Sequence, residues 1–342
     1  MVFRDLPNGG CGASPCHDRL RKSHAESAQG ATIMGSQETP VLGGTAAARA
    51  AALVAVLVSS ILIAVVPNFS KLAYEAGASV PLVIVGRFLV TVLLLSLLLA
   101  SQRRSLLTSV RVLRLCLIGG IATAAMSFGI LAAITRIDIS LVILIVYLHP
   151  VLVAWVGHVR GNYVLSRFRL ACCVIILIGL VFALSVGFER LDAVGMALAS
   201  VGACGATGLL ITNGEAVGEG GTVIVNLYTA VAALIPACIV ATVIGPLNLP
   251  GTGTGWLAIF GTGASFCLGL ALFFAAVPLI GLVRATLISI LEPLFAILIA
   301  MALFGERLAA LQWVGVVIVL TGLLMLEIPP EQTNRLLGMA RR

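Results

Sequence analysis

Four ionisable side chains lie inside long apolar stretches of this 342-residue chain, namely Lys71, Arg87, His149 and Glu292. A charged residue at the centre of a membrane helix costs at least about 2.5–3.5 kcal/mol on insertion scales. Such a group therefore usually faces a partner or a cavity. These four residues are the candidates for chemistry, and the apolar elements around them must position them.

Two of the four directly precede a proline in the sequence: Glu292 before Pro293 and His149 before Pro150. Glu292 could carry a proton or bind a cationic solute, or it could bond to backbone groups freed by a proline that has no N–H. His149 titrates near neutral pH, as a proton-coupled step requires, or it is a neutral core histidine bonded to the next helix. Our hypothesis is that both side chains reach a central cavity.

Arg87 keeps its charge when buried and therefore needs an anion or water. The sequence leaves two kinds of anion open, the carboxylate of a solute or a protein acid such as Glu75 or Glu292.

Lys71 closely follows Pro67 and Asn68. We expect the proline to break or kink the helix and Asn68 to cap the freed backbone. Lys71 then either extends to the membrane interface or lines the mouth of a pathway. Weaker candidates, which we interpret mainly as interface anchors, are Tyr147, Trp155, Asn226, Tyr228 and Trp313.

The composition points to a lipid bilayer as the surrounding medium. Hydrophobic residues make up 60% of the chain and charged residues 10%, where a soluble domain has about 25% charged residues. The mean hydropathy is +1.14. These values exclude a soluble enzyme, a disordered chain and a disulfide-stabilised secreted domain. The sequence contains neither a phosphate-binding loop nor a His-Glu-x-x-His zinc motif, so we expect no ATP-driven step, no metal and no cofactor.

The eight cysteines do not indicate disulfide bonds. Cys11 and Cys16 lie near His17 and His24, but their spacing matches no standard metal site. The other six lie in apolar runs and are expected to be small core residues: Cys116, Cys172, Cys173, Cys204, Cys238 and Cys267.

Ten apolar segments follow a polar stretch at residues 1–48, which we interpret as a disordered cytoplasmic tail. Translation could start at Met1 or at Met34. Each segment approaches the ~20 apolar residues that a membrane helix needs. The expected spans are 51–73, 80–100, 115–134, 139–157, 169–187, 194–214, 222–244, 256–277, 285–304 and 309–326.

The basic residues between these spans predict the orientation. Sixteen Lys and Arg residues fall on the side of the N-terminus, and Arg136, Arg190 and Arg307 fall on the other. Loops rich in Lys and Arg stay in the cytoplasm. We therefore predict a multi-pass protein of the cell (inner) membrane with both termini cytoplasmic.

The two halves of the chain share a pattern. Pro150 and Pro293 are each followed 29 residues later by a glycine, Gly179 and Gly322. A duplicated unit of five spans must be inserted upside down the second time, and inverted repeats of this kind are typical of secondary transporters. The predicted boundaries are 49–188 for the first repeat, 189–327 for the second and 328–342 for a cytoplasmic C-terminal tail.

Several motifs make the chain similar to EamA domains of the drug/metabolite transporter superfamily. The second half carries Glu292-Pro293, then Gly305-Glu306-Arg307, then Gly322; the first half carries Asn68-Phe69, Lys71 and Arg87-Phe88. The resemblance extends from about residue 50 to 327. It implies ten helices in two inverted EamA repeats and export or exchange of small metabolites. The first repeat departs from the pattern, with His149 where the family often has Glu.

The sequence thus predicts an all-α membrane protein with ten transmembrane helices and no enzymatic activity. We expect a secondary transporter of small metabolites or drug-like solutes that exports by alternating access, with possible proton coupling. Its expected partners are a small-molecule substrate and the lipid bilayer, with no nucleic acid, and it acts as a monomer or homodimer. The alternative is a multi-pass membrane regulator or assembly partner that transports nothing.

Overall fold

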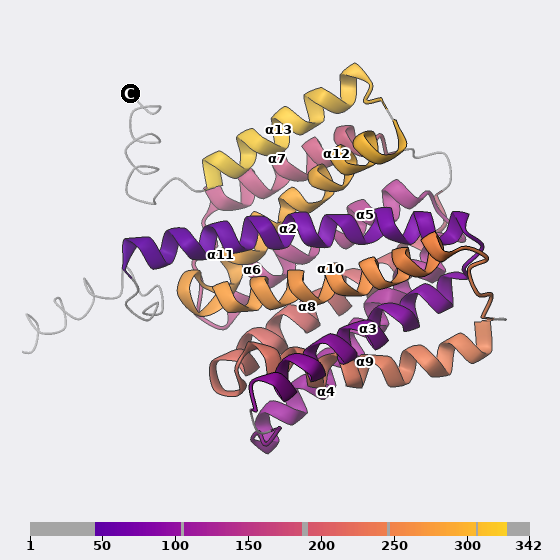
Figure 1. Cartoon of the computed structure of the whole chain (residues 1–342). Helices are drawn as coiled ribbons and strands as arrows, with labels where there is room; N and C mark the ends of the chain where they lie inside the picture. The colour runs from indigo at the N-terminus through magenta and orange to yellow at the C-terminus, as the bar shows by residue number, and fades with distance from the viewer. Residues whose placement is uncertain (1–44, 104–105, 187–190, 245–246, 306, 327–342) are drawn as a thin grey trace, which may run out of the picture. The chain divides into compact units, whose positions relative to one another are not determined.

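The computed structural model describes residues 45–103, 106–186, 191–244, 247–305 and 307–326 (Figure 1). Residues 1–44 of the predicted N-terminal tail, with Cys11, Cys16, His17, His24 and Met34, and the predicted C-terminal tail lie outside these ranges. The last three residues of the predicted disordered tail, 46–48, instead form the start of a helix. Every regular element in them is helical: α2 (Ala46–Glu75), α3 (Val80–Ser101), α4 (Val110–Ala133), α5 (Ile139–Val146), α6 (His149–Val159), α7 (Arg167–Ala183), α8 (Ala193–Gly220), α9 (Thr222–Ile244), α10 (Gly253–Ile280), α11 (Leu282–Ile288), the 3₁₀ turn η1 (Ser289–Leu291), α12 (Glu292–Phe304) and α13 (Ala310–Leu326).

These elements form the ten expected crossing units. Eight stretches in the described ranges are long and apolar enough to span a membrane; α5 with α6 and α11 to α12 each count as one. The remaining two units, α7 and α13, have 17 residues each and pack against each other. At 1.5 Å per residue, 17 residues extend about 25 Å, slightly less than a typical hydrocarbon core.

Apolar side chains cover the outside of the bundle. On α3, Leu89, Leu93 and Leu97 follow one another at four-residue intervals, and each exposes more than half of its surface. In water this stripe would be unfavourable, whereas lipid tails solvate it. The expectation that six cysteines are core residues is wrong for two of them. Cys204 and Cys238 are exposed, because they lie on helix faces without a protein neighbour.

The helix contacts come in pairs that are related by exchange of the two repeats. The first helix of each repeat packs along the third of the other, as α2 with α10 and α8 with α4. Likewise, the packing of α4 on α9 has its counterpart in the packing of α10 on α3. The pairs α3 with α9 and α7 with α13 each map onto themselves when the two repeats are exchanged. This exchange is what an inverted repeat predicts. The fold is therefore all-α, with ten helical crossings in two inverted halves.

The two glycines that suggested the repeat occupy matching positions. A Cβ atom on Gly179 of α7 would lie 2.8 Å from Cγ2 of Val319 on α13. A Cβ atom on Gly322 of α13 would lie 2.6 Å from Cγ1 of Ile176 on α7. Gly179 thus makes room for Val319, three positions before Gly322, and Gly322 makes room for Ile176, three positions before Gly179. The missing side chains let the two short helices approach closely.

The ends of the helices gather on two sides of the bundle. We call the side where α2 begins the proximal side and the side where α2 ends the distal side. On the proximal side, Arg160 after α6 pairs with Glu215, and Arg111 of α4 lies 3.8 Å from Glu219. On the distal side, Arg136 lies 3.2 Å from Asp192.

The sequence analysis ended the sixth span at residue 214, which placed Glu215 and Glu219 in a loop. That boundary was wrong. Helix α8 continues to Gly220 because both acids are held by arginines, and Gly221 ends it with a φ of 74°.

A glycine-to-alanine substitution tests how closely α7 and α13 approach. A Cβ atom on Gly315 would lie 2.2 Å from the backbone nitrogen of Ala183. We expect Gly315→Ala to destabilise the protein by about 1–3 kcal/mol, because backbone must move. The measurement is unfolding in detergent micelles. The matched control is Gly218→Ala, which meets nothing within 4 Å and should stabilise α8 by up to about 1 kcal/mol. Equal effects of the two substitutions would contradict the close packing.

Candidate functional site

The two proline-bearing crossings are interrupted at the residues that the sequence singled out. Helix α5 ends at Val146 and α6 starts at His149, the residue before Pro150. Helix α11 passes into the 3₁₀ turn η1, and α12 starts at Glu292, the residue before Pro293. A proline in a helix cannot donate to the carbonyl four residues earlier, so each interruption follows from the sequence. Both ionisable residues therefore begin a half-helix near the middle of a crossing.

Glu292 reaches across to the other repeat. Its carboxyl group lies close enough to the hydroxyl of Tyr147, at the interruption between α5 and α6, for the two groups to interact electrostatically. The N-terminus of a helix such as α12 is also a favourable place for a carboxylate, because backbone N–H groups there lack partners. One of the two alternatives for Glu292 was that its side chain bonds to the backbone groups freed by Pro293. The described contacts of this side chain include no such bond. The Ser289 carbonyl, four residues before Pro293, instead accepts from the N–H of Glu292.

His149 stabilises its own crossing. Its Nδ1 lies 2.9 Å from the carbonyl oxygen of Val146, the acceptor that Pro150 leaves without a donor. Because a carbonyl only accepts, Nδ1 must carry the hydrogen, and Nε2 is then the nitrogen that can take up a proton. The ring lies beside Tyr147, with ring centroids 5.7 Å apart. Tyr147 thus contacts both His149 and Glu292, which makes it more than the interface anchor we expected.

Tyr147, His149 and Glu292 are each half-buried, unlike the largely exposed leucines on the lipid-facing side of α3. That His149 and Glu292 both reach a central cavity stays a prediction.

The region around Pro67 differs from expectation. Helix α2 continues through Pro67 to Glu75, so the proline does not end the helix. The buried side chain of Asn68 donates from Nδ2 to the Ala64 carbonyl at 3.0 Å and to the Ala296 carbonyl of α12 at 3.2 Å. Ala296 lies one turn beyond Glu292. Asn68 therefore links α2 to the half-helix that begins with Glu292, and its role is to join two helices rather than to cap one.

Lys71 lies one turn before the distal end of α2. Its side chain is exposed, and Nζ lies 4.0 Å from the ring centroid of Phe304 at the end of α12. An ammonium group over an aromatic face is attracted by the negative potential of the ring. Lys71 therefore connects α2 and α12 on the distal side, about one turn from Asn68 and away from the interruptions.

Arg87 lies apart from the interruptions, near the distal end of α3. Its Nη2 donates to Ser127 Oγ of α4 at 2.9 Å. The guanidinium carbon lies 4.9 Å from the ring centroid of Phe88 and 4.8 Å from that of Phe266 on α10. Among the described residues, no ion pair includes Arg87, so neither Glu75 nor Glu292 serves as its counter-ion.

A buried group of polar residues lies between α3, α4, α8, α9 and α10. It borders a cavity of about 10 Å³, and the lining includes Thr91, Thr123, Asn226 and Thr229. The hydroxyl of Thr229 donates to Asn213 Oδ1 at 2.9 Å. Asn226 is 4% exposed, and neither atom of its amide has a partner in the described ranges. A cavity of this size holds about one water molecule, which would satisfy such an amide.

Sequence reasoning missed three contributors to these contacts. Tyr147 was undervalued, Ser127 was not considered, and Asn213 was overlooked inside an apolar span. The signal for Asn213 was available, because a buried asparagine in a membrane helix needs a partner. Ser127 gave no such signal, since serine is common where membrane helices pack. In the described part of the chain, no three His, Cys, Asp or Glu residues are placed to hold a metal ion.

Comparison with known proteins agrees with this geometry. The EamA-like transporter family matches the chain twice, over residues 50–185 and 193–328. The chain belongs to the EamA-like transporter family. Its two matches correspond to the two halves whose contacts exchange. A solved crystal structure aligns over 81% of this EamA chain and 96% of its own, with a TM-score of 0.67 at 15% identity, which shows a shared fold. A search of curated proteins finds no match.

A double-mutant cycle tests the contact between Tyr147 and Glu292. Each of Tyr147→Phe and Glu292→Gln weakens the same electrostatic interaction, so their effects on the free energy of unfolding should not add. We expect a coupling of about 0.5–3 kcal/mol, measured by unfolding in detergent. The control combines Glu292→Gln with Tyr228→Phe, whose hydroxyl donates instead to the Leu106 carbonyl at 2.7 Å. Additive effects in the first pair would show that the two side chains do not interact.

Proposed function

We propose that this EamA protein is a secondary transporter that exports small metabolites or drug-like solutes across the cytoplasmic membrane by alternating access. Family membership supports transport as the activity. The orientation with both termini in the cytoplasm, which makes the proximal side cytoplasmic, follows from the distribution of basic residues.

The observation that carries the mechanism is a difference in packing between the proximal and distal ends of the two interrupted crossings. On the proximal side, α6 packs against α11, the two half-helices that face each other there. Exchange of the repeats would make α5 pack against α12 in the same way on the distal side. These two half-helices do not pack against each other to a comparable extent. The contacts favour a state that is closed proximally and looser distally, as expected of one half of an alternating cycle.

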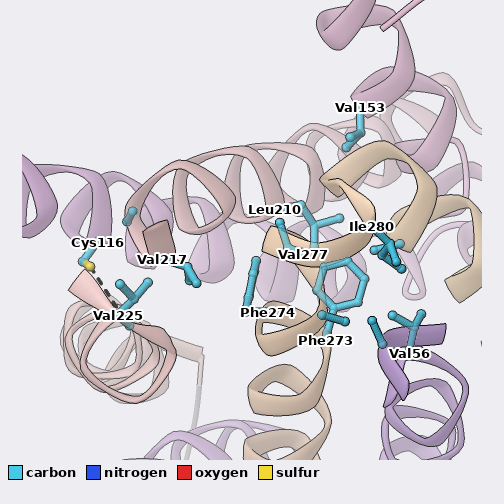
Figure 2. Close-up of a cluster of buried hydrophobic side chains, with 14 of the residues drawn as sticks. Val56, Cys116, Val153, Leu210, Val217, Val225, Phe273, Phe274, Val277 and Ile280 are labelled. Carbon is cyan, nitrogen blue, oxygen red and sulfur yellow. Dashed lines mark hydrogen bonds between the residues drawn. The ribbon is translucent and has the colours of Figure 1, made fainter. Parts of the chain in front are cut away.

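An apolar cluster closes the proximal side. Side chains from α2, α4, α6, α8, α9, α10 and α11 converge in it (Figure 2). Val56 of α2, Val153 of α6 and Phe274 of α10 are each almost completely buried there. The ion pairs of Arg160 with Glu215 and Arg111 with Glu219 lie on the same side. Opening this side would expose apolar surface at a cost of about 25 cal/mol per Å², so another set of contacts must form in exchange.

The residues at the interruptions suggest a route for coupling protons to solute movement. Glu292 can release and rebind a proton, Tyr147 lies beside it, and His149 in turn lies beside Tyr147 with Nε2 as the nitrogen that can take up a proton. Ionisable groups in membrane helices that contact one another are typical of proton relays in transporters. Because α11, η1 and α12 form one crossing, a change of charge at Glu292 acts on the same element that packs against α6.

Cysteine cross-linking tests the alternating states. Gly157 of α6 faces Val283 of α11, since a Cβ atom on Gly157 would lie 3.1 Å from Val283 Cγ2. Gly157→Cys with Val283→Cys should cross-link in this state, in a chain whose eight native cysteines are replaced. When Pro150 is matched to Pro293, Gly157 corresponds to Ala300 in the other repeat and Val283 corresponds to Ser140. Ser140→Cys with Ala300→Cys should cross-link in the opposite state, and either link should stop flux until it is reduced. Complete cross-linking of both pairs in the same molecules would contradict alternation.

Flux measurements test the coupling. In proteoliposomes with an imposed pH gradient, we expect Glu292→Gln to lower proton-driven flux by about tenfold or more while exchange of solute continues. His149→Gln should have a smaller effect, since its contact to the Val146 carbonyl is structural. The matched surface controls are Glu219→Gln and His158→Gln. If Glu292→Gln together with His149→Gln leaves the rate and its pH dependence unchanged, the proton route is wrong. If the unmodified chain moves no solute at all, the transporter proposal is wrong.

A further inference from the structure

Arg87 is the one cation in a membrane crossing whose surroundings, within the described residues, resemble a ligand-binding site. Two aromatic rings lie against the guanidinium group, one from its own helix and one from α10. The two rings are themselves in edge-to-face contact, with centroids 6.1 Å apart, so they enclose the guanidinium group from one side. The side chain as a whole keeps some accessible surface, whereas its Nε atom is buried.

The donors of the guanidinium group are only partly used. Nη2 donates to Ser127 Oγ, while the buried Nε has no partner among the described residues. Adjacent N–H groups of a guanidinium match the two oxygens of a carboxylate, which is why arginine binds carboxylates in a bidentate manner. An unpaired Nε next to Nη2 is therefore an incomplete site for that ligand.

The protein itself supplies no counter-charge. The ion pairs of the described chain involve Arg111, Arg136 and Arg160, but not Arg87. The nearest group with an electrostatic influence on Arg87 is the phenol of Tyr74 on α2, which is neutral at physiological pH. A buried charge that only stabilised the fold would be expected to have an acidic partner.

We propose that Arg87 anchors the carboxylate of a small organic anion, with Ser127 as a second donor, so that the solutes carried by this protein include carboxylates. This inference rests on the proposed transport function and names its substrate class. Phe88 and Phe266, which both contact the guanidinium group, also line the polar cavity together with Thr91 and Asn226. The apolar walls favour a compact anion with a short carbon chain over a strongly hydrated inorganic ion.

Thermal unfolding of the purified full chain in detergent tests the binding site. Acetate, lactate and succinate are compared with acetamide, lactamide and succinamide, which have similar shapes without the charge, and with phosphate and chloride. We expect the carboxylates to raise the unfolding temperature and the amides to leave it unchanged. Equal shifts from amides, or from phosphate and chloride, would overturn the carboxylate assignment.

Two substitutions at Arg87 separate a ligand-binding role from a structural one. Arg87→Met should leave the unfolding temperature of the ligand-free chain unchanged or higher, because no protein acid loses a partner, and should abolish the shift caused by carboxylates. Arg87→Lys keeps the charge but not the planar fork, so its affinity should fall about tenfold. Arg111→Gln is the control, because it removes an arginine from the proximal surface and should not change the shift. If Arg87→Met unfolds the chain, or Arg87→Lys binds carboxylates as well as the unmodified chain does, the proposal is wrong.

The failure of this proposal is distinguishable from the failure of transport. Carboxylate binding without flux in proteoliposomes would contradict the transporter proposal and leave the site intact. Saturable flux of neutral solutes that is insensitive to Arg87→Met would keep transport and remove the carboxylate site.

Discussion

The structure depends on one constraint: backbone polar groups inside a bilayer must find partners within the protein, because lipid offers none. Helices meet this requirement everywhere except where a proline removes a donor. Pro150 and Pro293 do so near the middle of two crossings, and the polar residues next to them respond. His149 bonds to the carbonyl that Pro150 leaves free, and the N–H of Glu292 donates to the Ser289 carbonyl that Pro293 leaves free. The residues best suited to proton chemistry are thus also those that make the interruptions tolerable.

The same constraint explains how the two repeats meet. Tyr147 from the first interruption interacts with Glu292 at the second, so the two interruptions contact each other. Small residues allow the uninterrupted helices to pack closely around them, as Gly179 and Gly322 show for α7 and α13. A bundle held by such exchangeable contacts can form them on one side at a time. The packing of α6 on α11, without an equal contact of α5 with α12, fits this picture.

Particular residues show how far the sequence could be read. The ten crossings, the inverted halves and the interruptions at His149 and Glu292 follow from apolar length and proline position, both of which are local properties. The end of α8 could not be read in this way, because Glu215 and Glu219 are helical only through arginines on other helices. Pro67 also misled, since neighbouring contacts of Asn68 and Ala296 keep α2 continuous.

The sequence by itself determined the medium, the number of crossings and the family, because hydropathy, segment length and motif spacing are written along the chain. It also named the four ionisable residues, but it left open which partners they have. The folded structure adds that Glu292 lies close to Tyr147, that His149 bonds to its own crossing and that Arg87 contacts two aromatic rings away from any acid in the described ranges. The contacts of Glu292 with Tyr147 and of Arg87 with Phe266 join different helices, and helix packing rather than sequence spacing sets which faces meet.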